Sequence, residues 1–328
     1  MQVLIFGGTG NISSDFVSLL LEQGNDVTLL NRGNHPPVAG CQNLIADCSD
    51  GNAVKKALAG KTFDVVVDFI CFTPEDAKNA YNAIRERCGH FIFISTAVVY
   101  AKPPAMIPIR EDAPKGNRFS EYGQLKWAAE QFFMEKFEKE NFPVTIIRPS
   151  HTYSKKWIPN PLTSAGYNFA SRIEHGQPVF VHDDGRGLWT LTHSRDFARP
   201  LAALCKNAES IGEDYNLTSD HVMTWNEIIL EIAYALGEYE PKIEYIPTDF
   251  ICKVLPFMHD KLVGDKMHPG VFDNTKLKKA VHGFDCEITF AQGIRESIAW
   301  FKEDLARQVI NPVIDRQYQQ LLTAWGKK

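Results

Sequence analysis

Short apolar runs alternate with amphipathic segments through the first half of the chain. The apolar runs predict strands at residues 2–6, 25–30, 44–45, 64–70, 90–95 and 144–147. Segments with helical periodicity predict helices at residues 16–23, 74–87 and 120–139. The strands are apolar along their length instead of alternating, which is typical of a parallel sheet covered on both faces. The first half is therefore predicted to form an α/β fold with a doubly wound parallel sheet.

The pattern becomes less regular after Pro149. Residues 155–161 combine lysines, prolines and a tryptophan and predict a loop, whereas residues 179–192 predict two strands joined by a turn. Amphipathic helices are expected at residues 225–236 and 290–301. This mixture is suited to shaping a substrate pocket.

The change of pattern divides the chain into two predicted parts. At 328 residues, the chain can hold one large or two modest domains. We expect residues 1–152 to form a dinucleotide-binding domain and residues 153–328 to form mainly a smaller, mixed α/β substrate-binding region. Residues from about 188 to 204 are expected to return to the first domain.

Charge and cysteine usage exclude several functional classes. The net charge of −5 offers no general attraction to nucleic acid or to an anionic membrane. The sequence contains neither a signal-peptide pattern nor an apolar run of about 20 residues, so no membrane association is expected. The seven cysteines are scattered, without a Cys-x-x-Cys pair. Neither a disulfide framework nor a metal site is therefore predicted, and a cytoplasmic location is expected.

A glycine-rich turn between the first predicted strand and helix carries the first chemical signal. Gly7, Gly8 and Gly10 lie in Gly-Gly-Thr-Gly-Asn-Ile-Ser, where backbone N–H groups and the following helix attract phosphate. Glycine allows a tight turn and the close approach of a pyrophosphate. Ser13 replaces the usual third glycine and is small enough for strand–helix packing. The turn predicts a dinucleotide site, with a tight turn that binds no ligand as the alternative.

The residues after the second and third strands bear on the choice of cofactor. The second strand ends at Asn31 and Arg32, where an acidic residue would bind an adenosine ribose. The lack of an acid, with a cation adjacent, favours NADP(H) over NAD, unless Arg32 stacks on adenine or points to solvent. Asp47, after the third strand, is expected to receive the adenine amino group or to be a plain surface carboxylate.

Tyr122 and Lys126 form a Tyr-x-x-x-Lys pair in a predicted helix. Residues four apart share a helix face, so the ammonium group is expected near the phenol. A phenol with a pKa of about 10 is a poor base at neutral pH, and a neighbouring cation lowers that pKa. With a dinucleotide turn upstream, the pair predicts acid/base chemistry.

Five motifs in order give the chain a family resemblance. They are Gly-Gly-Thr-Gly-Asn-Ile, Asp47, Ile-Ser-Thr-Ala-Val-Val-Tyr at residues 94–100, Tyr-Gly-Gln-Leu-Lys and Arg-Pro-Ser at residues 148–150. In this order the chain resembles the extended short-chain dehydrogenases/reductases, the NAD-dependent epimerase/dehydratase family. Segments at residues 192–196 and 272–276 extend the resemblance to nearly the whole chain. It implies a Rossmann-type sheet and an NAD(P)-dependent enzyme.

The resemblance also implies roles for individual residues. Thr96 takes the position of the family's catalytic Ser/Thr, Tyr122 that of the acid/base, and Lys126 that of the residue that orients ribose and lowers the pKa of the phenol. The residues expected to bind the cofactor are Gly7, Thr9, Gly10, Asn11, Ile12, Asn31, Arg32, Asp47, Cys48, Phe69, Ile70, Lys126, Pro149 and His151. The residues expected to bind the substrate are Ala97, Val98, His151, Trp157 and Trp189.

The chain departs from the family's pattern around the substrate. The dehydratases carry an acidic pair where this chain has Ala97 and Val98, which disfavours elimination of water. Sugar epimerases generally have Asn at the position of His151 and a diphosphate-binding arginine at the position of Trp189. Loss of that arginine counts against a nucleoside-diphosphate substrate. The lysines that could replace its charge are Lys155, Lys156, Lys261 and Lys266.

Three functions are compatible with these residues. The first is an NAD(P)-dependent sugar-nucleotide epimerase or related sugar oxidoreductase, in which Tyr122 takes a hydroxyl proton and a keto intermediate forms; a true epimerase would use NAD. The second is an NADPH-dependent carbonyl reductase on a non-nucleotide substrate, consistent with Arg32. The third is a catalytically inactive NAD(P)-sensing or RNA-binding member of the fold. Retention of Thr96, Tyr122 and Lys126 argues against the third.

The expected partners are few. We expect a small-molecule substrate (a sugar nucleotide or another hydroxyl or carbonyl compound), no nucleic acid and no membrane. Family relatives often dimerise through the helix that carries the Tyr-x-x-x-Lys pair, so a homodimer is expected. Phe132, Phe133 and Phe137 would supply its apolar face, although core packing explains them equally well.

Overall fold

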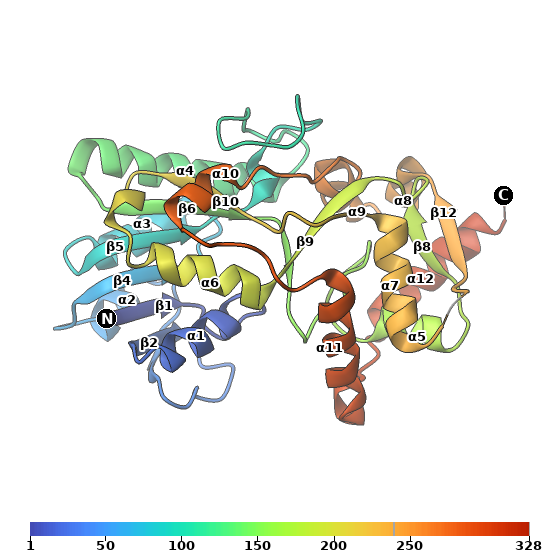
Figure 1. The fold of residues 1–328 in the computed structure, drawn as a ribbon, viewed down its shortest axis with the longest axis horizontal. Helices are drawn as coiled ribbons and strands as arrows, with labels where there is room; N and C mark the ends of the chain where they lie inside the picture. The colour runs from blue at the N-terminus through green and yellow to red at the C-terminus, as the bar shows by residue number, and fades with distance from the viewer. Residues whose placement is uncertain (239, 328) are drawn as a thin grey trace.

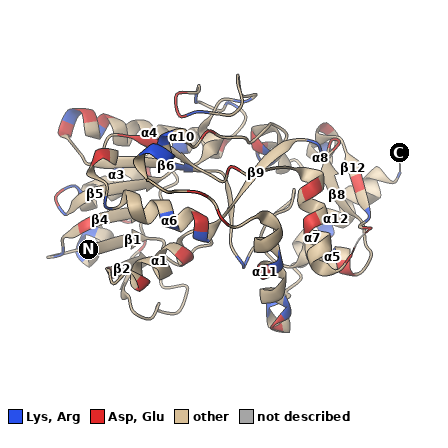
Figure 2. Cartoon of the chain, viewed as in Figure 1, with Lys and Arg blue, Asp and Glu red and all other residues tan. Residues whose placement is uncertain are grey.

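The computed structural model describes residues 1–238 and 240–327. Figure 1 shows two lobes side by side, with the N-terminus on one and the C-terminus on the other. In the same view, Figure 2 shows Lys and Arg interspersed with Asp and Glu over both lobes. No helix in the described part of the chain is long and apolar enough to cross a bilayer.

A parallel seven-stranded sheet forms the centre of the first lobe. In spatial order, its strands are β10 (Asp214–Leu217), β6 (Val144–Pro149), β5 (Cys88–Ile94), β4 (Phe63–Asp68), β1 (Gln2–Phe6), β2 (Asp26–Asn31) and β3 (Gln42–Ile45). Every neighbouring pair is parallel. The order of strands reverses between β1 and β4, and such sheets bind ligands outside the carboxyl ends of the strands at this point. The predicted Rossmann-type, doubly wound sheet is confirmed.

Helices cover both faces of this sheet. One face is covered by α2 (Gly51–Ala57), α3 (Pro74–Ile84) and α4 (Glu121–Glu140), and the other by α1 (Ser13–Glu22), α6 (Ser194–Leu204) and α10 (Thr275–Ala280). Alternate residues of β1 serve the two layers: Leu4 and Phe6 pack in the first, and Val3 and Ile5 in the second. Because both sides of each strand are buried, apolar residues occupy consecutive positions.

Segments from the second half of the sequence complete the first lobe. Strand β10 pairs with β6, helix α6 packs against α1, and helix α10 packs against β10. The returning part is therefore longer than the expected stretch at about 188–204. Within that stretch, β9 (Leu188–His193) lies in the second lobe and only α6 lies on the large sheet.

Two small sheets and several helices make up the second lobe. One sheet has the order β11-β9-β7, with β11 at Val222–Thr224 and β7 at His151–Tyr153, and the other pairs β12 (Ile243–Ile246) with β8 (Val179–His182). The strands predicted within residues 179–192 are thus β8 and β9, in different sheets. The helices are α5 (Asn168–Glu174), α7 (Trp225–Leu236), α8 (Thr248–Val254), α9 (Met258–Lys261), α11 (Phe290–Lys302) and α12 (Pro312–Trp325). Helices α7 and α11 confirm the two predicted amphipathic helices.

The phenylalanines suggested as a dimer face contribute to the core of the chain. Phe133 is fully buried, and Phe132 and Phe137 pack against the same core cluster beneath α4. Core packing therefore explains these rings, and the homodimer stays a prediction.

Candidate active site

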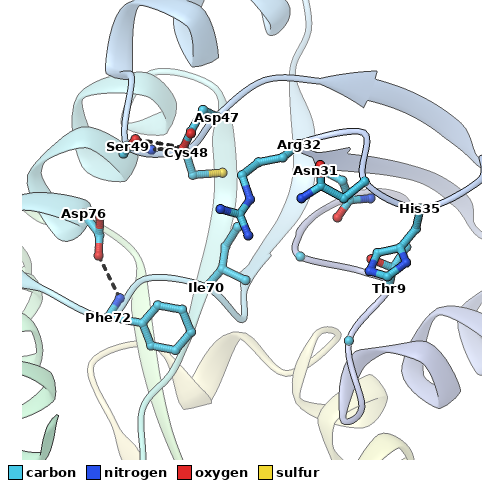
Figure 3. Close-up of a pocket in the computed structure, with 13 residues that line it drawn as sticks. Thr9, Asn31, Arg32, His35, Asp47, Cys48, Ser49, Ile70, Phe72 and Asp76 are labelled. Atoms are coloured by element: carbon cyan, nitrogen blue, oxygen red, sulfur yellow. Dashed lines mark hydrogen bonds between the residues drawn. The ribbon is translucent and has the colours of Figure 1, made fainter. Parts of the chain in front are cut away.

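A cleft of about 460 Å³ lies at the carboxyl ends of β1, β2 and β3. Figure 3 shows Arg32 reaching across it toward Ile70, with His35 close to Thr9. Arg32 and His35 are the basic residues of its lining, and Asp47 and Asp76 the acidic ones. The complete lining is Gly7, Thr9, Gly10, Asn31, Arg32, Asn34, His35, Asp47, Cys48, Ser49, Ile70, Phe72 and Asp76.

The glycine turn in this cleft has the shape that a pyrophosphate needs. Gly7 has a φ of +79°, and a Cβ there would lie 2.3 Å from Cγ2 of Ile70. The residue before α1, Ile12, makes no side-chain capping bond, so no capping side chain competes with a phosphate for the start of the helix. Ser13 donates to the Gly7 carbonyl at 2.6 Å and accepts from the Gly10 amide at 2.9 Å. Ser13 thus stabilises the turn. The residues of this turn fit the pyrophosphate of a dinucleotide.

Asp47 follows β3 and lies in the lining of the cleft. Its carboxylate accepts from the amide of Ser49 at 3.0 Å and from its hydroxyl at 2.8 Å. These two hydrogen bonds lower the pKa of Asp47 because they stabilise the charged form. Asp47 is therefore an ionised acceptor at neutral pH.

Tyr122, in the first turn of α4, meets Thr96 at the end of β5. Both side chains line one cavity, and the Thr96 hydroxyl acts to lower the pKa of the Tyr122 phenol. Their approach depends on Gly123, where a Cβ would lie 2.7 Å from the carbonyl oxygen of Val98. The Ser120 hydroxyl caps α4 by accepting from the amide of Gly123 at 3.0 Å. The helix therefore touches the loop after β5 backbone to backbone, which brings the phenol to Thr96.

Lys126 lies one turn beyond Tyr122 and is almost fully buried. Its ammonium group donates to the carbonyls of Cys71 at 2.7 Å and Ile94 at 2.8 Å. Burial lowers the pKa of Lys126, an effect that Asp68 and other nearby groups oppose.

The pKa of Tyr122 is higher than the sequence led us to expect. Desolvation of the hydroxyl raises this pKa to about 12 although 39% of the residue is exposed, while the Thr96 hydroxyl acts in the opposite direction. The ammonium group of Lys126 is directed at backbone carbonyls and does not lower this pKa. At neutral pH the phenol is therefore protonated and able to donate.

A buried ion pair holds α4 in place beneath the site. Arg148 on β6 pairs with Glu130 on α4 through two nitrogens, at 2.7 Å and 3.0 Å. Glu130 also accepts from the hydroxyl of Ser95, the neighbour of Thr96, at 2.5 Å. Bidentate arginine–carboxylate pairs are directional, so this one sets the position of Lys126, one turn before Glu130, relative to β5 and β6.

A second cavity, of about 300 Å³, opens on Thr96 and Tyr122. Its lining contains no arginine. All five residues predicted to bind substrate lie in the lining, which consists of Ile12, Thr96, Ala97, Val98, Tyr122, Pro149, Ser150, His151, Thr152, Trp157, Trp189, Thr190, Asp265, Lys266, Gly270 and Phe272.

Both ring nitrogens of His151 are engaged in this cavity. The indole N–H of Trp189 donates to Nδ1 at 3.1 Å, and Nε2 lies 2.8 Å from the hydroxyl oxygen of Ser164. Because an indole can only donate, Nδ1 is unprotonated and the neutral ring carries its hydrogen on Nε2. Burial, with the charge of Lys266, lowers the pKa of His151 to about 3. His151 is therefore a neutral part of the wall.

Comparison with known proteins gives the family. The model of the NAD dependent epimerase/dehydratase family matches residues 3–218. The chain belongs to this family. The resemblance drawn from the sequence motifs is thus confirmed, and with it membership of a family of nicotinamide-dependent enzymes.

Curated relatives of this chain differ in their described activities. 2'-Dehydrokanamycin reductase of Streptomyces kanamyceticus is 25% identical over 240 residues, which cover 72% of this chain and 67% of that protein. The chloroplast stem-loop binding protein of 41 kDa b of Arabidopsis thaliana is 27% identical over 317 residues, which cover 90% of this chain and 78% of that protein. Human dTDP-D-glucose 4,6-dehydratase is 23% identical over 334 residues, which cover 92% of this chain and 90% of that protein.

Solved structures of the family share the fold. An epimerase of Methanothermobacter thermautotrophicus superposes with a TM-score of 0.77 at 19% identity, covering 93% of both chains. UDP-glucose 4-epimerase of Thermus thermophilus, solved with NAD, has a TM-score of 0.73 at 22% identity, covering 92% of this chain and 99% of that one.

Most of the residues expected to bind the cofactor lie in one of the two linings. Those that line the cleft are Gly7, Thr9, Gly10, Asn31, Arg32, Asp47, Cys48 and Ile70. Ile12, Pro149 and His151 line the second cavity instead. Asn11 joins the lobes by donating to the Thr152 carbonyl at 3.2 Å. Phe69 lies outside the lining, because its ring packs on Phe16 of α1, 5.9 Å between centroids.

Several residues of the site were missed at the level of sequence, among them Gly123, Thr190 and Asp265. Gly123 had a signal, because a glycine inside a helical pattern costs about 1 kcal/mol relative to alanine and therefore points to a close contact. Asp265 had none: it lies in a segment without periodicity, more than 140 positions from Tyr122. Only the packing of the second lobe on α4 reveals it.

Proposed function

We propose that this chain catalyses NAD(P)-dependent hydride transfer at one hydroxyl or carbonyl carbon of a sugar-type substrate. The observation that carries the proposal is that Thr96 and Tyr122 line one cavity at the carboxyl end of the sheet, where Thr96 acts on the pKa of the Tyr122 phenol. The names of the relatives support the substrate class, since dehydrokanamycin and dTDP-D-glucose both contain sugars.

Each side chain has a distinct task in this proposal. Bound nicotinamide would supply the hydride acceptor or donor. Tyr122 holds the proton that the substrate oxygen gains on reduction or loses on oxidation. Thr96 hydrogen-bonds the same oxygen and orients it. Lys126, on the same helix face, would orient the ribose of the cofactor.

The protonation state of Tyr122 indicates which proton transfer the ligand-free site is ready to perform. With a pKa of about 12, the phenol is protonated at neutral pH and is suited to donate to a carbonyl oxygen as that oxygen becomes a hydroxyl. Arg32 in the cleft supplies a cation for a 2'-phosphate. Both features favour an NADPH-dependent carbonyl reductase. Tyr122 would serve as the base in the reverse direction only when the bound state favours the phenolate.

Epimerisation of a sugar nucleotide is the second candidate. It is favoured by the fold shared with UDP-glucose 4-epimerase. In this reaction Tyr122 would take the hydroxyl proton and return it, so that a keto intermediate receives hydride on its other face. Net redox is then zero.

The two outcomes are separated by absorbance of the reduced nicotinamide. Purified protein would first be titrated with NADPH and NADH, followed by cofactor fluorescence, and then supplied with sugar-type alcohols and ketones. A stoichiometric absorbance change identifies a reductase, whereas altered sugar stereochemistry without such a change identifies an epimerase. A protein that binds neither cofactor contradicts the proposal, and RNA binding without turnover would support the third function.

A further inference from the structure

The substrate cavity contains a carboxylate that the proposed chemistry does not use. Asp265 lines the cavity together with Thr96 and Tyr122, and its charge acts on the phenol of Tyr122. Asp265 and Lys266 are the acidic and basic residues of the lining. A negative group beside the reacting centre constrains which substrates the cavity accepts.

A π-helical turn, η3 (Leu262–Lys266), presents this carboxylate. Such turns are rare and recur at functional sites. The carbonyl of Gly264 accepts from the side-chain amide of Asn117 at 2.7 Å. A Cβ on Gly264 would lie 3.0 Å from the carbonyl oxygen of Phe119, so the turn packs tightly on the loop before α4.

The preceding helix, α9, is joined to the start of α4 as well. The carboxylate of Asp260 accepts from the hydroxyl of Ser120 at 2.8 Å and from the amide of Glu121 at 2.9 Å. A carboxylate at this position also suits the positive end of the helix dipole. Because Tyr122 follows directly, the contacts hold Asp265 beside the phenol.

A buried lysine lies beside Asp265. The side chain of Lys102 is 1% exposed, and its Nζ lies 3.7 Å from Oδ1 of Asp265. Burial raises the pKa of Asp265, and the charges of Lys102 and Lys266 oppose this effect. A separation of 3.7 Å exceeds a normal hydrogen bond, so the carboxylate keeps acceptor capacity for another donor.

The other polar groups of the cavity are largely engaged, with one exception. His151 uses both nitrogens, and Lys266 donates to the carbonyls of Asn160 at 3.2 Å and Pro161 at 3.0 Å. The hydroxyl of Thr190 is fully buried and has no hydrogen-bond partner among the described residues. Buried polar groups are normally paired, so this hydroxyl keeps an unused hydrogen-bonding capacity in a residue of the cavity wall.

We propose that Asp265 and Thr190 bind the substrate through hydroxyl or ammonium groups near its reacting carbon, and that the substrate is a compact sugar without a nucleoside diphosphate. The inference rests on the proposed function and names the substrate class of the same site. A volume of about 300 Å³ is at the lower end for ligand pockets. A diphosphate would bring negative charge toward Asp265. Of the two cations nearby, Lys102 already pairs with this carboxylate, and Lys266 donates to two backbone carbonyls.

The test measures binding to the NADPH-loaded protein by isothermal titration and saturation-transfer NMR. The probes are methyl glucoside, glucosamine and UDP. Both sugars are expected to bind, and UDP is expected not to displace them. Loss of a hydrogen bond to a charged group corresponds to about 10-fold or more in affinity, so Asp265→Asn should weaken glucosamine binding by that factor. If the group that donates to Asp265 is an ammonium group, the same substitution should weaken the binding of methyl glucoside less than that of glucosamine.

Matched variants separate binding from folding. Asp249→Asn changes an exposed carboxylate of the same lobe and should alter neither sugar's affinity. Asp265→Asn with Lys102→Met avoids an unpaired buried cation, and Thr190→Val tests the second contact without a change of shape. NADPH affinity should be equal in all of them.

Three results would overturn the inference: unchanged sugar affinity in both Asp265→Asn and Thr190→Val, displacement of the sugars by UDP, or no binding of either sugar to the wild-type protein. The UDP competition uses only the wild-type protein and needs no variant to fold. Failure of the proposed function has a different signature, namely no binding of NADPH or full turnover by Tyr122→Phe.

Discussion

Replacing Gly123 by alanine tests how the acid/base pair is assembled. The new Cβ would lie 2.7 Å from the Val98 carbonyl, whereas ordinary contact begins at 3.4 Å, so the start of α4 must move away from the loop. Misplacement of a catalytic group by 1 Å costs about 10²-fold in rate, so we expect a loss in kcat/KM of about 10-fold to 10²-fold. Overpacking costs about 1–3 kcal/mol, and the better helix propensity of alanine returns up to about 1 kcal/mol. Activity should therefore fall much more than stability.

The assay compares hydride transfer and urea unfolding in the same variants. Glu138→Ala, on an exposed position of the same helix, controls for helix propensity and should leave kcat/KM unchanged. The affinity for NADPH should be equal in wild type and Gly123→Ala, because the glycine turn of the cleft lies elsewhere. Wild-type kcat/KM in Gly123→Ala would refute the argument that this close approach sets the position of Tyr122.

Three further predictions concern single side chains. Tyr122→Phe should retain cofactor binding, while turnover should fall by about 10²-fold or more, because the variant lacks the general acid/base. Stopped-flow absorbance would measure turnover, and a fully active variant would contradict the role given to Tyr122. Arg32→Glu should weaken NADP(H) more than NAD(H) in fluorescence titrations, and equal effects would show that the guanidinium does not meet a 2'-phosphate. His151, with a pKa lowered to about 3, should show no titration between pH 8 and pH 5 by NMR and carry its hydrogen on Nε2. The unfolded chain takes up this proton near pH 6.5, so the residue's contribution to the free energy of unfolding should shrink as the pH falls below that value.

The large sheet was predictable because its signals are local. Each strand is a short apolar run next to a turn or a helical segment, and burial on both faces leaves that run uninterrupted. The glycine turn was predictable for the same reason, since Gly7, Gly10 and Ser13 act within a single βα unit. These features require no knowledge of the second lobe.

The substrate cavity was only partly predictable because it combines distant segments. His151 and Trp189 were expected in it, but their mutual hydrogen bond, which makes the histidine a neutral wall residue, depends on the pairing of β7 with β9. Strand β10 could not be assigned to the large sheet because four residues carry little periodicity. Asp265 depends on a π-helical turn, which has no sequence period that we could recognise.

The repeated return of the chain to the large sheet limits how this protein can be divided. A fragment ending at residue 152 would lack β10, α6 and α10, leaving β6 as an unprotected edge and exposing the apolar surface of α1. Such a fragment is expected to aggregate. A chimera with a relative would need several splice points instead of one. Redesign of substrate choice in this protein is therefore better attempted by point substitution in the cavity than by exchange of a lobe.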